Sequence, residues 1–261
     1  MWDKLKILRK EYLALNLNDV LDYEKFAMIS IVYNSTKIEG CSLSENDTKV
    51  LLEKDITAKG KPLTDHLMVK DHYAAFHYIK KEAQNKQPIS IKLIKNVAEL
   101  VMKNTGGIIN SMAGSFDTSI GDLRKAQVYV DTKYFPDYSK VENLLAKLIE
   151  QVNQKLTTAK EDDILKLSAE IHYNLVNIHP FGDGNGRTSR LMMNYIQLYF
   201  NEPLIKIFTE DRAEYITALN QAEEQENIAV FHDFICSQQI KFYKNELEKH
   251  QNKGSGFTLL F

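Results

Sequence analysis

The sequence has few of the features that mark secreted, membrane-spanning or nucleic-acid-binding proteins. Only two of the 261 residues are cysteines, Cys41 and Cys236, which is too few for a disulfide framework and suits a reducing compartment. The formal net charge is -2 at pH 7, so no basic excess favours binding to nucleic acid. Charged residues interrupt residues 1–17, which lack the continuous apolar core of an export signal or a membrane span. We expect a cytoplasmic protein without a nucleic-acid or membrane partner.

The chain also lacks internal repeats and low-complexity tracts, which favours an ordinary globular fold. Hydrophobic residues make up 44% of a chain that is long enough to bury a substantial core. Apolar positions mostly recur at the helical spacing of three and four residues, and the clearest strand-like alternation lies around Val128 and Val130. The predicted fold class is therefore all-α with a short β-hairpin.

Loop-forming residues divide the predicted helices into regions. We expect an N-terminal helical region over 1–88, a core over 89–240, and a C-terminal helix end with a tail over 241–261. Within the core, residues 104–121 are rich in Gly and Ser and are expected to form a long connecting segment before the hairpin.

Glycine is scarce, but three of the 11 glycines fall within five positions, at Gly182, Gly184 and Gly186. They lie in the segment 179–190, which is His-Pro-Phe-Gly-Asp-Gly-Asn-Gly-Arg-Thr-Ser-Arg. Such a cluster lets backbone amides approach a ligand closely, and a polyanion is the natural ligand for them. The segment is not a P-loop, because no Lys follows the glycines. It is not a dinucleotide-binding loop either, because a helix rather than a strand precedes it.

Helices are predicted on both sides of this segment. Before it, apolar residues advance by three or four positions and form one stripe, made of Ile164, Leu167, Ile171, Leu175 and Ile178. Pro180 discourages a helical conformation at His179, so this histidine is expected at the end of the first helix. The second helix has its first turn at Asn185, and its free N–H groups and positive dipole end point back at the loop.

The residue types of the segment suit phosphoryl chemistry. A histidine with an ordinary pKa of about 6.5 can take a proton from an attacking hydroxyl, which makes His179 the candidate base. Asp183 offers hard oxygen for Mg²⁺. Arg187 and Arg190 lie three positions apart on one helix and can both donate to phosphate oxygens. Asn185 can donate an amide hydrogen bond where charge develops.

With every fixed position filled, residues 179–190 resemble the signature of the Fic family, His-Pro-Phe-x-Asp/Glu-Gly-Asn-Gly-Arg-x-x-Arg. The resemblance implies a helical core that transfers AMP from ATP to a Ser, Thr or Tyr hydroxyl of a target protein, with pyrophosphate as the leaving group. It implies that His179 deprotonates the hydroxyl and that Asp183 holds Mg²⁺ between the α- and β-phosphates.

The same resemblance assigns the rest of the segment to the nucleotide. The backbone amides from Gly184 through Gly186 to Arg187 would form an anion hole. Asn185 and Arg187 would contact the α- and β-phosphates, and Arg190 would contact the γ-phosphate.

A second segment resembles the inhibitory motif of self-restrained Fic proteins of class II, Ser/Thr-x-x-x-Glu-Gly/Asn. It is Ser35-Thr36-Lys37-Ile38-Glu39-Gly40, and the apolar residues before it keep helical spacing. Ser35 and Glu39 share one face of the predicted helix, and Gly40 can end the helix in a left-handed conformation. A carboxylate at a helix C-terminus opposes the helix dipole, so Glu39 is expected to have a cationic partner. The resemblance makes that partner Arg190, whose contact with the γ-phosphate would then be blocked.

Residues 124–136 stand where Fic proteins carry a flap that pairs with an extended target segment. Val128, Tyr129 and Val130 would offer their strand edge to the target and align its hydroxyl with His179. A small connecting hairpin without that role is an equal alternative.

Two buried-type aromatic positions have both a structural and a functional interpretation. Tyr215 matches a region where Fic proteins line the adenine with aromatic side chains, and packing in the helical core is the alternative. His172 lies seven residues before His179, and we expect it to pack in the core rather than to act as a second base.

Three functions are compatible with these patterns. The first is a self-inhibited protein adenylyltransferase, which could also modify itself. The second is a Fic-fold enzyme that uses another phosphate-linked donor or removes AMP. The third is a nucleotide-sensing interaction module, against which His179 argues, because binding has no use for a base. ATP and Mg²⁺ are the expected cofactors, a hydroxyl-bearing protein is the expected partner, and a homo-oligomer is left open.

Overall fold

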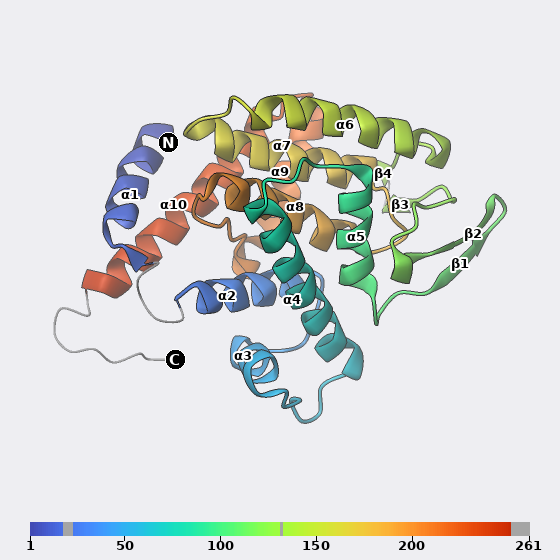
Figure 1. The fold of residues 1–261 in the computed structure, drawn as a ribbon, viewed down its shortest axis with the longest axis horizontal. Helices are drawn as coiled ribbons and strands as arrows, with labels where there is room; N and C mark the ends of the chain where they lie inside the picture. Colours follow the sequence, from blue (N-terminus) through green and yellow to red (C-terminus); the bar gives the residue numbers. More distant parts are fainter. Residues whose placement is uncertain (18–22, 131–132, 252–261) are drawn as a thin grey trace.

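The computed structural model describes residues 1–17, 23–130 and 133–251, and it is mainly helical (Figure 1). Its α-helices are α1 (Trp2–Ala14), α2 (Tyr23–Ile38), α3 (Glu45–Lys54), α4 (Leu63–Gln84), α5 (Ile91–Met102), α6 (Val141–Leu156), α7 (Asp162–Ile178), α8 (Asn185–Phe200), α9 (Arg212–Glu224) and α10 (Ala229–Gln251). The predicted helical class is confirmed. Helix α10 runs into the C-terminal region expected over 241–261, and residues 252–261 lie outside the described part.

Helix α8 lies in the interior of the helical body (Figure 1). Every residue from Arg187 to Gln197 is buried, as expected of a helix that packs on all of its faces. One hydrophobic cluster packs α7 and α8 against α4, α5 and α6, and a second packs them against α1, α9 and α10. The two helices therefore form a fixed pair, and the loop that joins them reaches the surface at Asp183.

Helix α2 runs beside α4 and brings its C-terminal end to α8. Its last two turns are buried on the face that carries Ser35, Thr36 and Ile38. Gly40 follows with a φ of 95°, a left-handed conformation that glycine adopts without strain and that ends the helix. The predicted helix end at Gly40 is confirmed, and it places Glu39 beside α8.

Two antiparallel hairpins lie on one side of the body, at the right of Figure 1. In the first, β1 (Ile108–Ser111) pairs with β2 (Gly114–Asp117), and in the second, β3 (Tyr129–Val130) pairs with β4 (Lys133–Tyr134). The second hairpin is the predicted one. The expectation of a connecting segment over 104–121 was wrong, because β1 and β2 lie within it. Only Phe116 is fully buried in these two strands, so no alternation of apolar residues marks them in the sequence.

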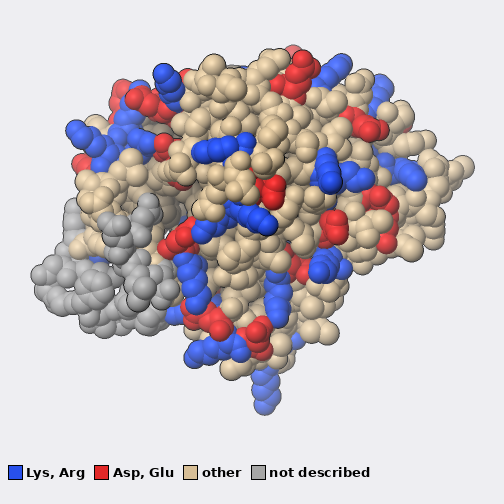
Figure 2. Space-filling view, in the orientation of Figure 1, with Lys and Arg blue, Asp and Glu red and all other residues tan. Residues whose placement is uncertain are grey.

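Charged side chains of both signs are interspersed over the face shown in Figure 2, in keeping with the net charge of -2. Among the described helices, none combines the length and the apolar character that are needed to cross a bilayer.

Candidate active site

The loop between α7 and α8 is shaped by its own side chains. His179 follows α7 in a left-handed conformation, with φ 50° and ψ 61°, and its N–H still donates to the Leu175 carbonyl at 3.0 Å. Asn185 closes the loop, because its Oδ1 accepts from the Phe181 N–H at 3.0 Å and its Nδ2 donates to the Phe181 carbonyl at 2.9 Å. Phe181 is buried and anchors the loop. The Asn185 amide, predicted as a phosphate contact, is engaged in holding this turn.

Two glycines let other groups approach the start of α8. Gly184 has a φ of 76°, and a Cβ there would lie 2.8 Å from Met102 Sδ. A Cβ on Gly186 would lie 2.4 Å from Glu39 Oε1. The absence of a side chain at Gly186 is therefore what allows the Glu39 carboxylate to lie over the first turn of α8.

His179 is half-buried against the second hairpin. Its ring stacks on Phe135, with ring centroids 4.0 Å apart and 27° between the planes. Burial lowers the pKa of His179 to about 4, although a hydrogen bond of 3.4 Å between Nδ1 and the Val176 carbonyl opposes the shift. The imidazole is therefore neutral at pH 7. If Nδ1 carries the proton toward Val176, Nε2 is the free acceptor, as a general base requires.

Arg187 is buried but incompletely paired. Its Nη1 donates to the Val101 carbonyl at 3.4 Å, its Nη2 lies 3.1 Å from Met102 Sδ, and Asp183 Oδ1 is 3.7 Å from Nη2. Its Nε has no hydrogen-bond partner in the described structure. Burial lowers the pKa of Arg187 despite the nearby Asp183 and Glu39 carboxylates. A buried guanidinium with weak partners and an unused donor suits an anion that arrives from outside.

Arg190, one turn further along α8, is fully engaged with α2. Its Nη2 donates to Glu39 Oε1 at 2.6 Å and to the Ser35 carbonyl at 2.9 Å, and its Nε donates to Ser35 Oγ at 2.8 Å. Burial acts to raise the pKa of Glu39, but Arg190 outweighs it and the pKa is lowered. The structure thus brings Ser35, Glu39 and Arg190 together, as the resemblance implied.

The side chains behind Arg190 form a buried pair. Tyr215 is 2% exposed, and its hydroxyl lies 2.9 Å from Nε2 of the fully buried His172. Burial acts to lower the pKa of Arg190, but Glu39 and Tyr215 outweigh it and raise it. Tyr215 therefore lies in the core behind Arg190, and His172 packs there too, as expected of it.

Asp183 points its carboxylate to the surface, with 68% of the side chain exposed. In the described part of the chain, no group of three or more His, Cys, Asp or Glu side chains could hold a metal ion by itself. A single carboxylate fits Mg²⁺ when nucleotide phosphates and water complete the shell, which is how this cation is often bound.

The predicted flap residues lie in or next to β3. Val128 accepts at its carbonyl from the Phe135 N–H at 3.2 Å, and Tyr129 is 66% exposed with its ring 5.7 Å from that of Tyr134. Tyr129 and Val130 form the strand itself. Through Phe135, which follows β4, this hairpin is the element that contacts the His179 ring.

Sequence reasoning missed three contributors to the site. Met102 packs under Gly184 and Arg187, and Phe135 packs on His179. In the sequence Arg124 is only the first residue of the flap segment, yet it is 1% exposed and donates from Nε to the His179 carbonyl at 2.7 Å. None of the three belongs to a recognisable motif, so only the three-dimensional fold identifies them.

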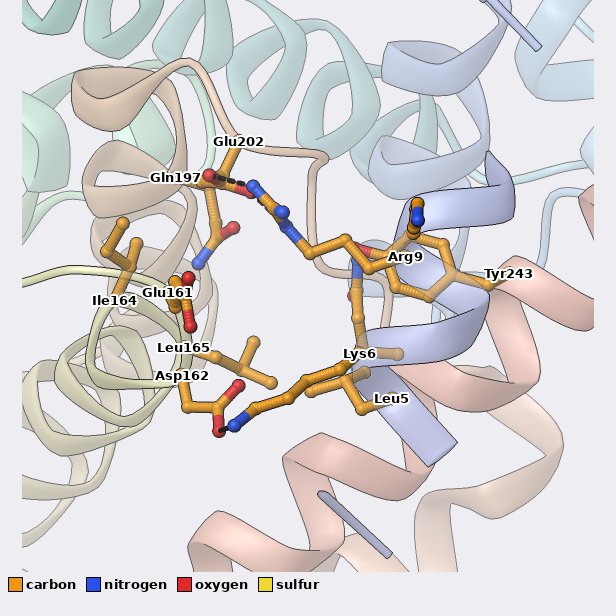
Figure 3. Close-up of a pocket in the computed structure, with 12 residues that line it drawn as sticks. Leu5, Lys6, Arg9, Glu161, Asp162, Ile164, Leu165, Gln197, Glu202 and Tyr243 are labelled. Atoms are coloured by element: carbon orange, nitrogen blue, oxygen red, sulfur yellow. Dashed lines mark hydrogen bonds and ion pairs between the residues drawn. The ribbon is translucent and has the colours of Figure 1, made fainter. Parts of the chain in front are cut away.

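A cavity lies elsewhere, between α1, α7, α8 and α10 (Figure 3). It has a volume of about 270 Å³ and is spanned by two ion pairs, Arg9 with Glu202 and Lys6 with Asp162. No residue of the α7–α8 loop lines it. Its mixed charges give no match to a triphosphate, so the first turn of α8 remains the candidate anion site.

The chain is similar to known proteins over the region that carries this site. Residues 88–197 match the model of the Fic/DOC family. Over 195 residues the chain is 33% identical to protein adenylyltransferase fic-1 of Caenorhabditis briggsae, a match that covers 73% of this chain and 36% of that protein. It is 33% identical over 202 residues to protein adenylyltransferase Fic of Aedes aegypti, covering 77% and 38%. The chain thus spans less than two fifths of the length of these curated relatives.

Solved structures agree with the fold. A Fic domain containing signaling protein from Bacteroides thetaiotaomicron superimposes with a TM-score of 0.81 at 21% identity, over 98% of this chain and 99% of that one. A fragment of Fic-1 from Caenorhabditis elegans superimposes with a TM-score of 0.78 at 25% identity, over 97% of this chain and 72% of that one.

Proposed function

The chain is a Fic/DOC family protein, and from that premise we propose that it is a self-inhibited protein adenylyltransferase. It would transfer AMP from ATP to a Ser, Thr or Tyr hydroxyl of a target protein, and to itself as a side reaction. Its curated relatives at 33% identity are named protein adenylyltransferases, which supports the proposed reaction.

One observation carries the proposal. The carboxylate of Glu39 lies over Gly186 at the positive end of α8 and accepts from Arg190 at 2.6 Å. A helix N-terminus with two buried arginines is an anion site, and here a side chain of the same protein takes part of it. With 35% of its side chain exposed, Glu39 stands at the open edge of that site, where an incoming phosphate would compete with it.

The nucleotide would be held by the first turn of α8. The amides around Gly184 and Gly186 and the unused donor of Arg187 would face the α- and β-phosphates. Arg190 would take the γ-phosphate once Glu39 leaves. Asp183 would hold Mg²⁺, which offsets the charge of the α- and β-phosphates.

The transfer step would begin at His179. Its Nε2 accepts the proton of the target hydroxyl, and the hydroxyl oxygen forms a bond to the α-phosphorus. The bond from that phosphorus to the oxygen bridging the α- and β-phosphates breaks, and pyrophosphate leaves with the electron pair. The strand edge at Val128, Tyr129 and Val130 would register the target, because this hairpin lies beside the His179 ring.

Two residues take roles that differ from those that the resemblance implied. Tyr215 is buried and contacts His172, so we propose that it supports Arg190 from behind rather than lining the adenine. Asn185 uses its amide to close the loop, so we propose that it shapes the cradle.

The test is labelling with ATP that carries its radioactive phosphorus at the α-position. The Glu39→Gly variant should label itself or an added protein target more strongly than the parent, and adding His179→Ala should abolish the label. ATP labelled at the γ-position is the control and should leave the protein unlabelled. Label from the γ-position would indicate a different transferred group. Nucleotide binding without label from either position would favour a nucleotide-sensing module.

A further inference from the structure

Arg124 is a buried cation without an acidic partner. Its side chain is 1% exposed, and among the described residues no carboxylate lies within ion-pair distance of it. Burial lowers the pKa of Arg124, although Asp137 opposes the shift from farther away. Removing a charged group from water is costly unless strong hydrogen bonds replace the hydration. The position of Arg124 therefore depends on the groups to which it donates.

All of its observed side-chain hydrogen bonds go to backbone carbonyls. Nε donates to His179 at 2.7 Å, Nη1 donates to Ala126 at 2.7 Å, and Nη2 donates to Pro136 at 2.5 Å. A longer contact of 3.5 Å joins Nη2 to the carbonyl of Ile178. The planar fork of a guanidinium can direct donors at three carbonyls in this way, whereas a lysine has a single nitrogen.

These carbonyls belong to two different parts of the site. The carbonyls of Ile178 and His179 lie at the C-terminal end of α7, where carbonyls have no partner within the helix. A cation at this end also interacts favourably with the helix dipole. The carbonyls of Ala126 and Pro136 lie just before β3 and just after β4, on the two sides of the hairpin. The Arg124 N–H adds a fifth tie, to the Pro180 carbonyl at 2.9 Å. Arg124 thus connects the α7–α8 loop to the hairpin, and its hydrogen bonds to these carbonyls together form a joint between the two.

The joint also sets the relation between two rings. Phe135 directly precedes Pro136, which Arg124 holds, and its ring stacks on that of His179. The backbone at His179 is held by the same guanidinium. The backbone next to each of the two stacked rings is therefore hydrogen-bonded to the same side chain, that of Arg124.

We propose that Arg124 is a positioning residue that fixes the base His179 and the target-docking hairpin in one relation. This inference rests on the proposed function, because it assigns the hairpin to the target and His179 to proton transfer. A hydroxyl registered on the β3–β4 edge would reach Nε2 of His179 only if loop and hairpin keep their relative places. Arg124 lies outside the nucleotide cradle, so its loss should affect the transfer step and not the binding of ATP.

The first test is Arg124→Lys in the Glu39→Gly background. We expect kcat for transfer to a protein target to fall about 100-fold, since displacement of a reacting group by about 1 Å has that effect, with KM for ATP unchanged within about threefold. Arg9→Lys is the matched control, because Arg9, like Arg124, donates from more than one nitrogen, but to Glu202, far from the site. It should leave kcat unchanged. An unchanged kcat in Arg124→Lys, or an equal loss of ATP binding, would overturn the proposal.

The second readout is independent of AMP transfer. The charged groups near the His179 ring are Arg124, Lys133 and Asp183, burial is the main cause of its low pKa, and Phe135 stacks on the ring. When the joint loosens, the ring should gain water, and the pKa of His179 should rise from about 4 toward the ordinary 6.5. Titration of histidine ring signals by NMR, assigned with His179→Ala, measures this shift. An unchanged pKa of His179 in Arg124→Lys would contradict the joint, even if no variant transfers AMP. If the pKa rises as expected but no variant transfers AMP, only the proposed function is contradicted.

A second variant covers the case in which Arg124→Lys fails to fold. Gln127 is exposed, and its Nε2 donates to the Phe135 carbonyl at 2.6 Å, which is a separate tie within the hairpin. If Arg124 is the joint, Gln127→Ala should keep kcat within about threefold. A 100-fold loss there would show that the hairpin depends on Gln127 instead, and would overturn the proposal.

Discussion

Arg187 and Arg190 lie one turn apart on α8 and are buried to the same degree, yet they differ in their hydrogen-bond partners and in the direction of their pKa shifts. Arg190 has a carboxylate at 2.6 Å, a hydroxyl and a carbonyl as partners, and its pKa is raised against the effect of burial. Arg187 has a sulfur, a long carbonyl contact, the exposed Asp183 carboxylate at 3.7 Å and an unused Nε, and burial lowers its pKa. The difference comes from α2, which reaches only the second arginine. Of the two proposed phosphate ligands, Arg187 thus keeps an unused donor while Arg190 is occupied.

The largest effect is expected when the base is removed and both arginines are left. In the Glu39→Gly background, His179→Ala should lower transfer about 1,000-fold, because general-base catalysis contributes that order of rate. ATP affinity should stay the same, since both arginines and the loop amides remain. Quantitative labelling and calorimetry measure the two quantities. A parallel loss of ATP affinity would contradict the separation of base and cradle.

The two arginines should differ in their response to truncation. Arg187→Ala should weaken ATP binding about 10- to 100-fold, since hydrogen bonds from a charged donor contribute about 1.5 to 3 kcal/mol. Arg190→Ala should show a comparable loss only when Glu39→Gly is also present, because Glu39 occupies Arg190 in the parent. Calorimetric titration with ATP of Arg187→Ala and Arg190→Ala, each with and without Glu39→Gly, tests this. Equal losses from both arginines in the parent would abolish the distinction between them.

The acidity of His179 predicts a pH profile. Because burial lowers its pKa to about 4, transfer by the Glu39→Gly variant should stay level from pH 8 to 5 and fall about tenfold per pH unit below 4. The unfolded chain binds this proton at an ordinary pKa of 6.5, so the group costs stability as pH falls from 6.5 toward 4. Rates should therefore be checked against circular dichroism. An apparent pKa near 6.5 for transfer would contradict a His179 ring whose pKa is lowered by burial.

The smallest effect is expected at the support of Arg190. Ser35→Ala removes the hydroxyl that accepts from Nε at 2.8 Å and leaves both Glu39 and the Ser35 carbonyl in place. One hydrogen bond to a charged group contributes about 1.5 kcal/mol, so the occupied state should weaken and self-labelling should rise by up to about tenfold. Ser30→Ala on the same helix is the matched control, because Ser30 contacts Lys206 rather than Arg190. Equal labelling in both variants would show that Ser35 does not hold Arg190.

Much of this site could be predicted from the sequence because it depends on short, local patterns. The stripe before His179 and the proline after it predict a helix end, and the spacing from Ser35 to Glu39 predicts a shared face. The contact of Glu39 with Arg190 was expected from the resemblance, and it is present. By contrast, β1 and β2 are mostly exposed, so they leave no alternating pattern.

The remaining features depend on long-range contacts that no local pattern encodes. An arginine in a polar stretch is ordinarily solvated, and two of the carbonyls that hold the buried Arg124 are 54 and 55 positions away in sequence. The pairing of Tyr215 with His172 spans 43 positions in the same way. Asn185 matches the expected motif, yet its amide closes the loop, a role that its spacing alone does not distinguish from phosphate contact.

The most direct measurement is the affinity of Glu39→Gln for ATP and for AMP by calorimetry, compared with the parent. The substitution keeps the shape of the side chain and removes the charge that holds Arg190. The account predicts that ATP binds at least about tenfold more tightly, which corresponds to about 1.4 kcal/mol, while AMP affinity is unchanged because AMP has no γ-phosphate for Arg190. Unchanged ATP affinity, or an equal gain for AMP, would contradict the competition between Glu39 and the triphosphate.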